Sequence, residues 1–151
     1  MSRFATGVTV ITTRLGDEVH GMTANAVTSV SLDPVLILIC VDKTADTHDI
    51  LPQAGCFAVN ILDRDQEEIS RVLATKKGER STKLDGVAHS FGATGAPLID
   101  GSLAQLDCLI VKEYEGGDHT IFLGEVVAAK ESGEGEPLVF YGGRYGQFTA
   151  G

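Results

Sequence analysis

The sequence lacks an excess of positive charge. Its 151 residues include 12 Lys and Arg residues against 21 Asp and Glu residues, which gives a formal net charge of −9. Surfaces that bind nucleic acids or anionic membranes need clustered positive charge. This balance argues against nucleic acid and against a membrane as partners of the protein.

Long hydrophobic runs are also missing. The longest strongly apolar run is VLILIC at residues 35–40, whereas a helix needs about 20 apolar residues to cross a bilayer. Residues 1–7 lack the charged, apolar and cleavable parts of a signal peptide. We therefore expect a cytoplasmic protein.

Cysteine is scarce and irregularly placed. The three cysteines, Cys40, Cys56 and Cys108, are an odd number at wide spacing, and the first two lie in apolar runs. A disulfide framework or a metal site would need paired or closely spaced cysteines. We interpret them as reduced thiols that pack in the core, and we expect no metal site.

Several common catalytic signatures are absent. No G-x-G-x-x-G follows a predicted strand and no G-x-x-x-x-G-K-[ST] occurs, so neither a Rossmann nor a P-loop nucleotide site is supported. H-E-x-x-H, C-x-x-C and G-x-S-x-G are missing as well. Zinc chemistry and acyl transfer by a protein nucleophile are therefore disfavoured.

What is present indicates one globular domain. Hydrophobic residues make up 43% of the chain and charged residues 22%, close to the averages of globular proteins. A chain of 151 residues matches the usual size of one domain with one core. We expect a single domain over residues 1–151.

Most of the chain has the composition of strands, being rich in Val, Ile, Thr and Phe between turn residues. The predicted strands are residues 7–13, 19–31, 35–42, 57–62, 103–115 and 119–130. LGDE at 15–18 and GGD at 116–118 are typical of hairpin turns, because glycine adopts positive φ angles. The sheet should therefore be largely antiparallel.

Two short helices are expected among these strands. The first spans residues 46–54 and stops at Gly55, a common left-handed terminator. The second begins after Asp63, with Gln66 as a capping-box variant, and continues toward Gly78. Since closure removes exposed strand edges, the predicted fold is mainly β: a small closed or partly closed β-barrel with short covering helices.

The stretch MTANAVTSVSLDP, residues 22–34, has small side chains and hydroxyls at almost every position. Side chains this small would let a planar ring reach the backbone N–H and C=O groups. Ser29 and Ser31 could donate hydroxyl hydrogen bonds to a phosphate. The alternative is that the stretch is only the polar face of a strand.

Two threonines lie at the start of the first predicted helix. Thr44 and Thr47 stand where free N–H groups and the helix dipole favour an anion. Lys43 and Lys83 could supply positive charge to the same anion. The alternative is that the threonines are ordinary helix caps.

Two glycine-rich clusters occur nearer the C-terminus. In GGDHTIFLGEV, residues 116–126, Asp118 and His119 follow a turn, so the imidazole should stand at the rim of the barrel, either bonding a ligand or as an exposed bystander. In FYGGRYGQF, residues 140–148, aromatics and Arg144 surround glycines. That loop could curl over a nucleotide, or form a packed tail or a subunit contact.

In this order and spacing, the clusters resemble the flavin reductase-like family of FMN-binding split-barrel proteins with Greek-key-like topology. The blocks that carry the resemblance are RFATGVTVITT, MTANAVTSVSLDPVLILICVDK, GCFAVNIL, GAPLIDGSLAQLDC, GGDHTIFLGEV and PLVFYGGRYG. No single block is specific, but six in register cover nearly the whole chain. The family commonly has a helix before the RFATG block, whereas this chain starts two residues ahead of it.

The resemblance implies a homodimer in which each barrel binds FMN or FAD, with NADH or NADPH stacked on the flavin for hydride transfer. It implies an NAD(P)H:flavin oxidoreductase, the reductase component that supplies reduced flavin to a partner monooxygenase. Two alternatives stay open: a non-catalytic FMN-binding electron-transfer flavoprotein, and a flavin-free binding module on the same barrel.

The resemblance also implies which residues act. His119 is the expected catalytic residue, facing the nicotinamide, and Arg144 and Tyr145 form a flap over the dinucleotide. Family members often follow the basic residue at Lys83 with an aromatic, where this chain has Leu84. The implied cofactor-binding residues are Thr23, Ala24, Asn25, Ala26, Val27, Ser29, Ser31, Cys40, Val41, Asp42, Lys43, Thr47, Lys83, Asp118, His119, Arg144 and Tyr145.

Overall fold

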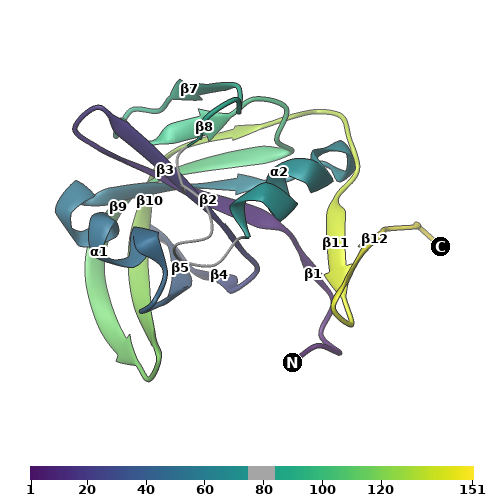
Figure 1. Ribbon diagram of the computed structural model, residues 1–151, viewed down its shortest axis with the longest axis horizontal. Helices are drawn as coiled ribbons and strands as arrows, with labels where there is room; N and C mark the ends of the chain where they lie inside the picture. Colours follow the sequence, from purple (N-terminus) through teal and green to yellow (C-terminus); the bar gives the residue numbers. More distant parts are fainter. Residues whose placement is uncertain (75–83) are drawn as a thin grey trace.

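A computed structural model describes residues 1–74 and 84–151. Its main element is a seven-stranded antiparallel sheet with the strand order β3-β2-β6-β9-β10-β5-β4 (Figure 1). The strands of this sheet are β2 (Thr9–Leu15), β3 (Glu18–Ala24), β4 (Val27–Leu32), β5 (Val35–Asp42), β6 (Cys56–Ile61), β9 (Ala104–Gly116) and β10 (His119–Glu131). The prediction of a mainly β, antiparallel protein is confirmed.

Two smaller sheets flank the large one. The first has the order β1-β11-β12, from β1 (Thr6–Gly7), β11 (Leu138–Tyr141) and β12 (Arg144–Gln147). The second pairs β7 (His89–Phe91) with β8 (Pro97–Ile99). The first sheet brings the beginning of the chain beside the C-terminal hairpin (Figure 1).

The segment predicted as one strand over residues 19–31 is two strands, β3 and β4, at opposite edges of the large sheet. Only Asn25 and Ala26 join them. Because consecutive Cα atoms are about 3.8 Å apart, so short a link requires the sheet to curl until its edges approach. Among the described residues β3 and β4 form no ladder, so the structure shows a curled sheet and not a closed barrel.

The helices follow from local signals. Helix α1 (Asp46–Ala54) ends at Gly55, which has φ 72° and donates its N–H to the Leu51 carbonyl at 2.9 Å. Asp63 caps the 3-10 turn η1 (Arg64–Gln66), and the Gln66 side chain returns the bond to the Asp63 N–H, as predicted. Helix α2 (Glu67–Leu73) continues from that turn. None of the helices in the described ranges is long and apolar enough to span a membrane.

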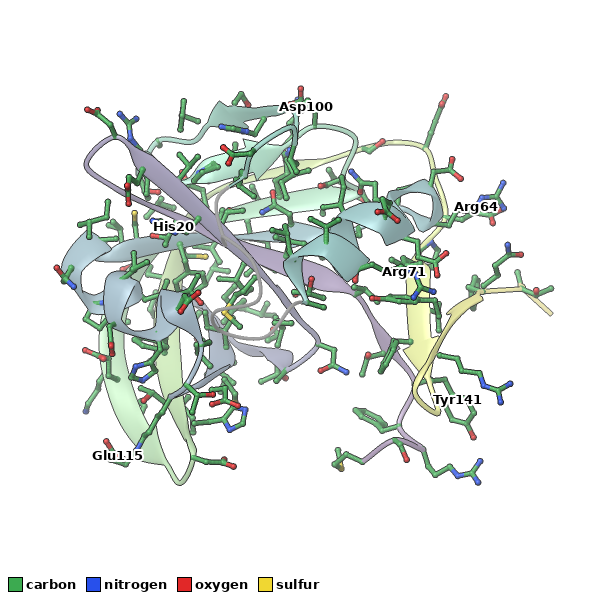
Figure 2. The ribbon with its side chains drawn as sticks, viewed as in Figure 1. His20, Arg64, Arg71, Asp100, Glu115 and Tyr141 are labelled. Atoms are coloured by element: carbon green, nitrogen blue, oxygen red, sulfur yellow. The ribbon has the colours of Figure 1, made fainter. Side chains whose placement is uncertain are left out.

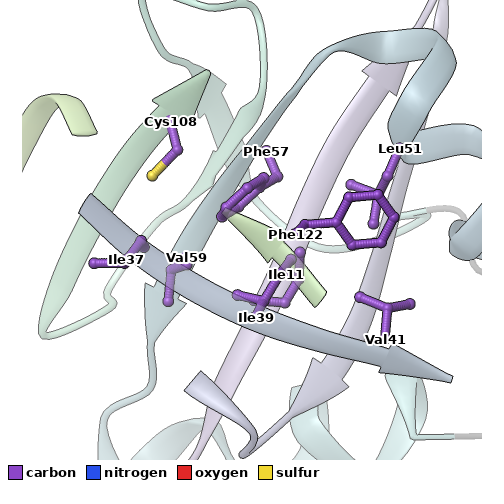
Figure 3. Close-up of a cluster of buried hydrophobic side chains, with 9 residues drawn as sticks. All are labelled: Ile11, Ile37, Ile39, Val41, Leu51, Phe57, Val59, Cys108 and Phe122. Atoms are coloured by element: carbon purple, nitrogen blue, oxygen red, sulfur yellow. The ribbon is translucent and has the colours of Figure 1, made fainter. Parts of the chain in front are cut away.

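The main hydrophobic cluster lies inside the curled sheet and against α1 (Figure 3). Alternate residues of β5 point inward, so Ile37, Ile39 and Val41 are buried while their neighbours face out. Cys108 in this cluster is fully buried, and burial, with Asp107 adding to it, raises the pKa of its thiol to about 12. Cys56 is also buried, and all three cysteines are free.

A second cluster packs α2 against the other side of the sheet. It comprises Val8, Val10, Leu62, Leu73, Leu84, Ile99 and Leu138. Leu138 begins β11, so this cluster fixes the C-terminal hairpin to α2 and to the start of β2. The β3–β4 link lies between α2 and β5, because the Thr23 hydroxyl donates to the Ser70 carbonyl of α2 and the Ala26 carbonyl accepts the Cys40 N–H of β5.

Candidate active site

A groove of about 670 Å³ opens beside the β3–β4 link. Its walls come from the N-terminal segment, the link itself, β4, the outward side of β5, and the end of β6. They are predominantly apolar, with Ala26, Val27, Leu38 and Cys40 among them. A mostly apolar concavity with a few polar groups is the usual form of a site for a flat organic cofactor.

The backbone is accessible in this groove because the side chains of the link are small. Asn25 and Ala26 are exposed, and a Cβ built on Gly7 would meet nothing within 4 Å. The Ala26 carbonyl accepts the Cys40 N–H at 3.0 Å, which fixes the link against β5. Asn25 and Ala26 therefore lie at the surface beside the groove, and the use of their backbone by a cofactor stays a prediction.

One hydroxyl in the groove wall has no partner. The Thr6 Oγ1 atom is buried and forms no hydrogen bond within the described ranges. Leaving such a group unpaired costs about 1–3 kcal/mol, so native proteins pair nearly all of them. Thr6 lines the groove, so a ligand whose polar edge displaced the atoms that now cover this hydroxyl would satisfy it.

A smaller pocket of about 170 Å³ lies on the other side of Asn25. Thr23 and Ala24 of β3 form one wall, and Tyr145 of β12 forms another. The Tyr145 hydroxyl lies 2.6 Å from the Ser70 Oγ. Because Asn25 lines both the groove and this pocket, a ring bound in each would be a close neighbour of the other.

A polar rim occupies the end of β5. His119 is the cross-strand partner of Asp42, and the Lys43 N–H donates to the Asp118 carbonyl at 2.9 Å. The His119 Nδ1 lies 2.7 Å from an Asp118 carboxylate oxygen. The rim is therefore two residues along β5 from Cys40 in the groove, on the same outward side of the strand.

Hydrogen bonds and ion pairs lower the pKa values of two carboxyl groups at this rim. The Asp42 carboxylate accepts both the N–H and the hydroxyl of Thr44 at 2.8 Å, and these bonds, with the nearby His119 and His48 charges, lower the pKa of Asp42. The Lys43 ammonium lies 2.6 Å from Glu115 and lowers the pKa of that carboxyl. Glu115 lies far across the molecule from Tyr141 of the C-terminal hairpin (Figure 2).

The structure thus divides the predicted site residues into groups. The groove and the small pocket bring together Thr23, Ala24, Asn25, Ala26, Val27, Cys40 and Tyr145. Asp42, Lys43, Asp118 and His119 form the adjacent rim and line neither cavity. Lys83 lies outside the described residues.

Two predicted residues do not offer their side chains. Val41 is fully buried in the core, so only its backbone could meet a cofactor. Thr47 is 1% exposed, and its hydroxyl donates to the Met22 sulfur at 2.7 Å. The helix-cap alternative for Thr44 and Thr47 is wrong, since the N-cap of α1 is Ala45 and it forms no side-chain cap bond.

The remaining predicted residues lie at the surface. Ser29 is exposed on β4, and the Ser31 hydroxyl accepts the Asp33 N–H at 3.3 Å. Arg144 is exposed where β11 turns into β12. By contrast, Tyr145 packs edge-on against Phe140, with ring centroids 5.4 Å apart. This packing is what the alternative of a packed tail over residues 140–148 predicts.

Sequence reasoning missed two residues that face these cavities. Thr6 lies in the RFATG block, but nothing in its spacing marks its hydroxyl as unpaired. Ser70 lies within α2, where a serine resembles an ordinary surface residue, yet it is fully buried. Its contacts are with residues far away in the chain, so no local pattern could have identified it.

Known proteins resemble this chain over nearly its whole length. The chain matches the model of the flavin reductase like domain over residues 1–149. It is 48% identical to an NADH-dependent FAD reductase from Streptomyces globisporus, over 97% of this chain and 81% of that protein. It is 37% identical to the reductase component of a 4-nitrophenol 4-monooxygenase/4-nitrocatechol 2-monooxygenase from Rhodococcus opacus, over 99% and 78%.

A solved structure supports the same relationship. The Streptomyces globisporus C-1027 NADH:FAD oxidoreductase SgcE6, in complex with NAD and FAD fragments, superposes with a TM-score of 0.91 at 47% identity. The match covers 98% of this chain and 88% of that one. The resemblance inferred from six sequence blocks is confirmed, and this chain belongs to the flavin reductase-like domain family.

Proposed function

We propose that this protein is an NAD(P)H:flavin oxidoreductase that transfers a hydride from NADH or NADPH to FMN or FAD. The observation that carries the proposal is the groove at the Asn25–Ala26 link, where an apolar cavity meets exposed backbone and the unpaired Thr6 hydroxyl. The relatives whose names state NADH-dependent flavin reduction favour NADH as the donor.

The residues present fit a flavin. The backbone from Thr23 to Val27 would bind the polar edge of the ring, and Leu38 and Cys40 would cover its apolar body. Bound together, the two cofactors would supply the redox chemistry themselves, a hydride transfer from C4 of the nicotinamide to N5 of the flavin. The chain's own contribution is to hold the two rings in position and to exclude water.

We assign the remaining roles on the basis of the family resemblance. Ser29 and Ser31 on β4 would contact the ribityl-phosphate chain. The backbone around Val41 and Thr47, with Lys43 and Lys83, would close around the flavin. His119, with Asp118 behind its Nδ1, would face the nicotinamide from the rim. Arg144 would contact the dinucleotide from the exposed turn of the C-terminal hairpin.

The decisive experiment follows NADH and NADPH oxidation at 340 nm with purified protein and either FMN or FAD. The proposal requires turnover that depends on both the flavin and the nicotinamide. An electron-transfer flavoprotein would bind flavin without oxidising the nicotinamide, and a flavin-free module would show no stabilisation by flavin in a thermal melt. Either result would overturn the proposal.

A substitution tests the location of the flavin. Ala26→Trp places a large ring in the groove and should weaken flavin binding about tenfold or more, because a buried aromatic side chain covers about 150–250 Å². The matched control is Ala93→Trp, at an exposed alanine in the turn before β8. Equal flavin affinity in both variants would place the flavin elsewhere.

We further propose that the protein is a homodimer with the split-barrel fold, one domain over residues 1–151, acting in the cytoplasm. Exposed apolar side chains gather on the neighbouring strands β4, β5, β10 and β9 and their connections: Leu32, Val35, Leu109, Val111 and Val127. An apolar surface of this kind favours a protein contact. Light scattering should report a dimer that Leu109→Glu weakens and Phe91→Glu, at an exposed residue of β7, does not.

The proposed physiological partner is a flavin-dependent monooxygenase that accepts the reduced flavin. Relatives of this chain are reductase components of such enzymes. The proposal predicts that this protein, NADH and flavin together sustain turnover by a purified two-component oxygenase. An oxygenase that works with chemically reduced flavin but never with this mixture would contradict it.

A further inference from the structure

Three side chains connect helix α1 to the start of β10. The Asp49 carboxylate lies 2.9 Å from the His48 Nδ1, and the His48 Nε2 lies 2.7 Å from the Thr120 hydroxyl. His48 and Asp49 belong to α1, whereas Thr120 is the second residue of β10 and follows His119. None of these three side chains lines the groove or the small pocket. They therefore attach the helix to the strand of the rim without entering either cavity.

The two bonds fix the tautomer of the His48 ring. A carboxylate oxygen only accepts hydrogen bonds, so Nδ1 carries the proton that points at Asp49. In the neutral ring Nε2 is then an acceptor, and the Thr120 hydroxyl donates to it. The same order of carboxylate, imidazole and hydroxyl orients the histidine of Ser-His-Asp triads. Thr120 is only 7% exposed, however, so its hydroxyl is a structural partner and not an accessible nucleophile.

The bond between His48 and Thr120 is shielded from water. The His48 side chain is 18% exposed, and its ring meets the fully buried Phe122 ring edge-on, with centroids 6.1 Å apart. Phe122 belongs to the main hydrophobic cluster (Figure 3). The nearby ion pair of Lys43 with Glu115 differs, because the Glu115 side chain is 84% exposed and exposed ion pairs contribute little. We therefore attribute the attachment of β10 to α1 to the bond of His48.

The start of β10 needs this attachment because two ladders end there. His119 is the first residue of β10, and its pairs with Asp42 on β5 and Gly116 on β9 are the last of both ladders. The ends of hydrogen-bonded elements open more readily than their middles. Successive side chains of a strand point to opposite faces, so Thr120 points toward α1 and His119 toward the rim. His48 thus holds the strand from the face opposite to His119.

We infer that His48 is a positioning residue: through Thr120 it holds the first residues of β10 in place, and so keeps His119 where it meets the nicotinamide ring. This inference rests on the proposed function, in which His119 faces the nicotinamide. It adds to that function a residue of α1 that touches neither ring and acts on the hydride donor only through the backbone of β10.

His48→Asn tests the inference because it removes the bond to Thr120. The shorter amide can still reach Asp49, but it ends short of the Thr120 hydroxyl, which is left unpaired in a buried place. That loss favours an open end of β10 about fivefold or more, the equivalent of ~1 kcal/mol at ~1.4 kcal/mol per tenfold. Because apparent affinity falls with the fraction of protein in the binding arrangement, the KM for NADH should rise about threefold or more, while kcat and the flavin Kd change less than about twofold.

Two further variants separate positioning from general damage to the helix. His48→Gln places an amide near the position of the imidazole Nε2, where it can bond the Thr120 hydroxyl, so its KM for NADH should stay within about twofold of the wild type. Thr120→Val removes the hydroxyl, keeps the imidazole, and should raise the KM as His48→Asn does. Adding His48→Asn to Thr120→Val should change the KM less than about twofold further, because both substitutions break one bond. Thr120→Val decides the matter if His48→Asn fails to fold.

Hydrogen exchange gives a readout that does not depend on turnover. The amides of residues 116–121 should exchange faster in His48→Asn than in the wild type, and at the wild-type rate in His48→Gln, while those of residues 57–61 stay unchanged in both. His89→Asn is the matched control, because His89 is also a half-buried histidine with a bonded ring, on the separate β7–β8 sheet. Its KM for NADH and its exchange at residues 116–121 should equal those of the wild type.

The outcomes distinguish this inference from the proposed function. An unchanged KM for NADH in His48→Asn would overturn the inference alone, as would a His48→Gln variant that is as impaired as His48→Asn. A raised KM with wild-type exchange at residues 116–121 would overturn it too, because the effect would then not pass through β10. A wild-type protein that oxidises no nicotinamide would overturn the proposed function and this inference together.

Discussion

Alkylation of Cys40 offers a test of the flavin groove in the unmodified protein. Cys40 is half-buried and lines the groove, whereas Cys56 is 5% exposed and Cys108 fully buried. Because burial raises the pKa of Cys108 to about 12, its thiol stays protonated at pH 8, and only the thiolate is nucleophilic. A small alkylating reagent should therefore modify Cys40 first.

Flavin should slow this reaction by an amount set by its occupancy. If the bound complex does not react, the rate falls by the factor 1 + [L]/Kd, which is about a hundredfold at a flavin concentration of 100 Kd. The measurement is iodoacetamide labelling at pH 8 with and without FMN or FAD, followed by peptide mass spectrometry. Adenosine monophosphate at the same concentration controls for non-specific protection.

The other two cysteines serve as internal standards in the same sample. Cys56 and Cys108 become reactive only when the core opens, so their labelling reports unfolding and not groove occupancy. Flavin should protect Cys40 far more than either of them. Equal labelling of Cys40 with and without saturating flavin would show that the groove is not the flavin site.

Three further predictions follow from the structure. His119→Ala should raise the KM for NADH about tenfold while changing the flavin Kd less than twofold, because His119 lies at the rim and outside the groove; unchanged NADH constants would refute its assignment. Gly124→Ala should destabilise the fold by about 1–3 kcal/mol in urea unfolding, because the new Cβ would lie 2.5 Å from the Phe57 Cζ; a stability equal to wild type would contradict this packing. Folding lowers the pKa of Asp42 below its ordinary value of 3.8 and that of Glu115 below 4.5. The two carboxylates therefore stabilise the fold at pH values above 3.8 and 4.5, and this stabilisation is lost as the pH falls through their lower folded-state pKa values. The melting temperature should therefore fall less steeply between about pH 5 and pH 3 in Asp42→Asn/Glu115→Gln than in the wild type, and identical slopes would refute this.

Features governed by neighbouring residues could be predicted from the sequence. The C-terminal end of α1 follows from Gly55, whose left-handed conformation ends the helix. The capping box at Asp63 and Gln66 depends on a spacing of three residues, which is visible in the sequence. The inward and outward sides of β5 follow from the two-residue period of a strand.

The division of residues 19–31 into β3 and β4 could not be predicted in the same way. Both halves have strand composition, and no glycine or proline marks the break between them, since Gly21, the one glycine of the segment, lies inside β3. The break at Asn25 and Ala26 arises because the chain leaves one edge of the sheet and joins the other. That requirement depends on the curl of the whole sheet, which is a property of seven strands together and not of any local pattern.

This division also changes what small side chains at residues 23–27 mean. A chain that crosses between two sheet edges over two residues needs little bulk there, whether or not a ligand binds, so slenderness alone does not identify a cofactor site. The Thr6 hydroxyl distinguishes the two explanations, because a crossing does not require an unpaired buried donor in the facing wall, whereas a bound ring with a polar edge would satisfy it. Removing that hydroxyl should therefore weaken flavin binding without weakening the fold: Thr6→Val should raise the flavin Kd about fivefold, the value of one hydrogen bond of ~1 kcal/mol, and should leave the melting temperature of the flavin-free protein unchanged or higher. If Thr6→Val binds flavin as well as the wild type, the slender segment is explained by chain crossing alone.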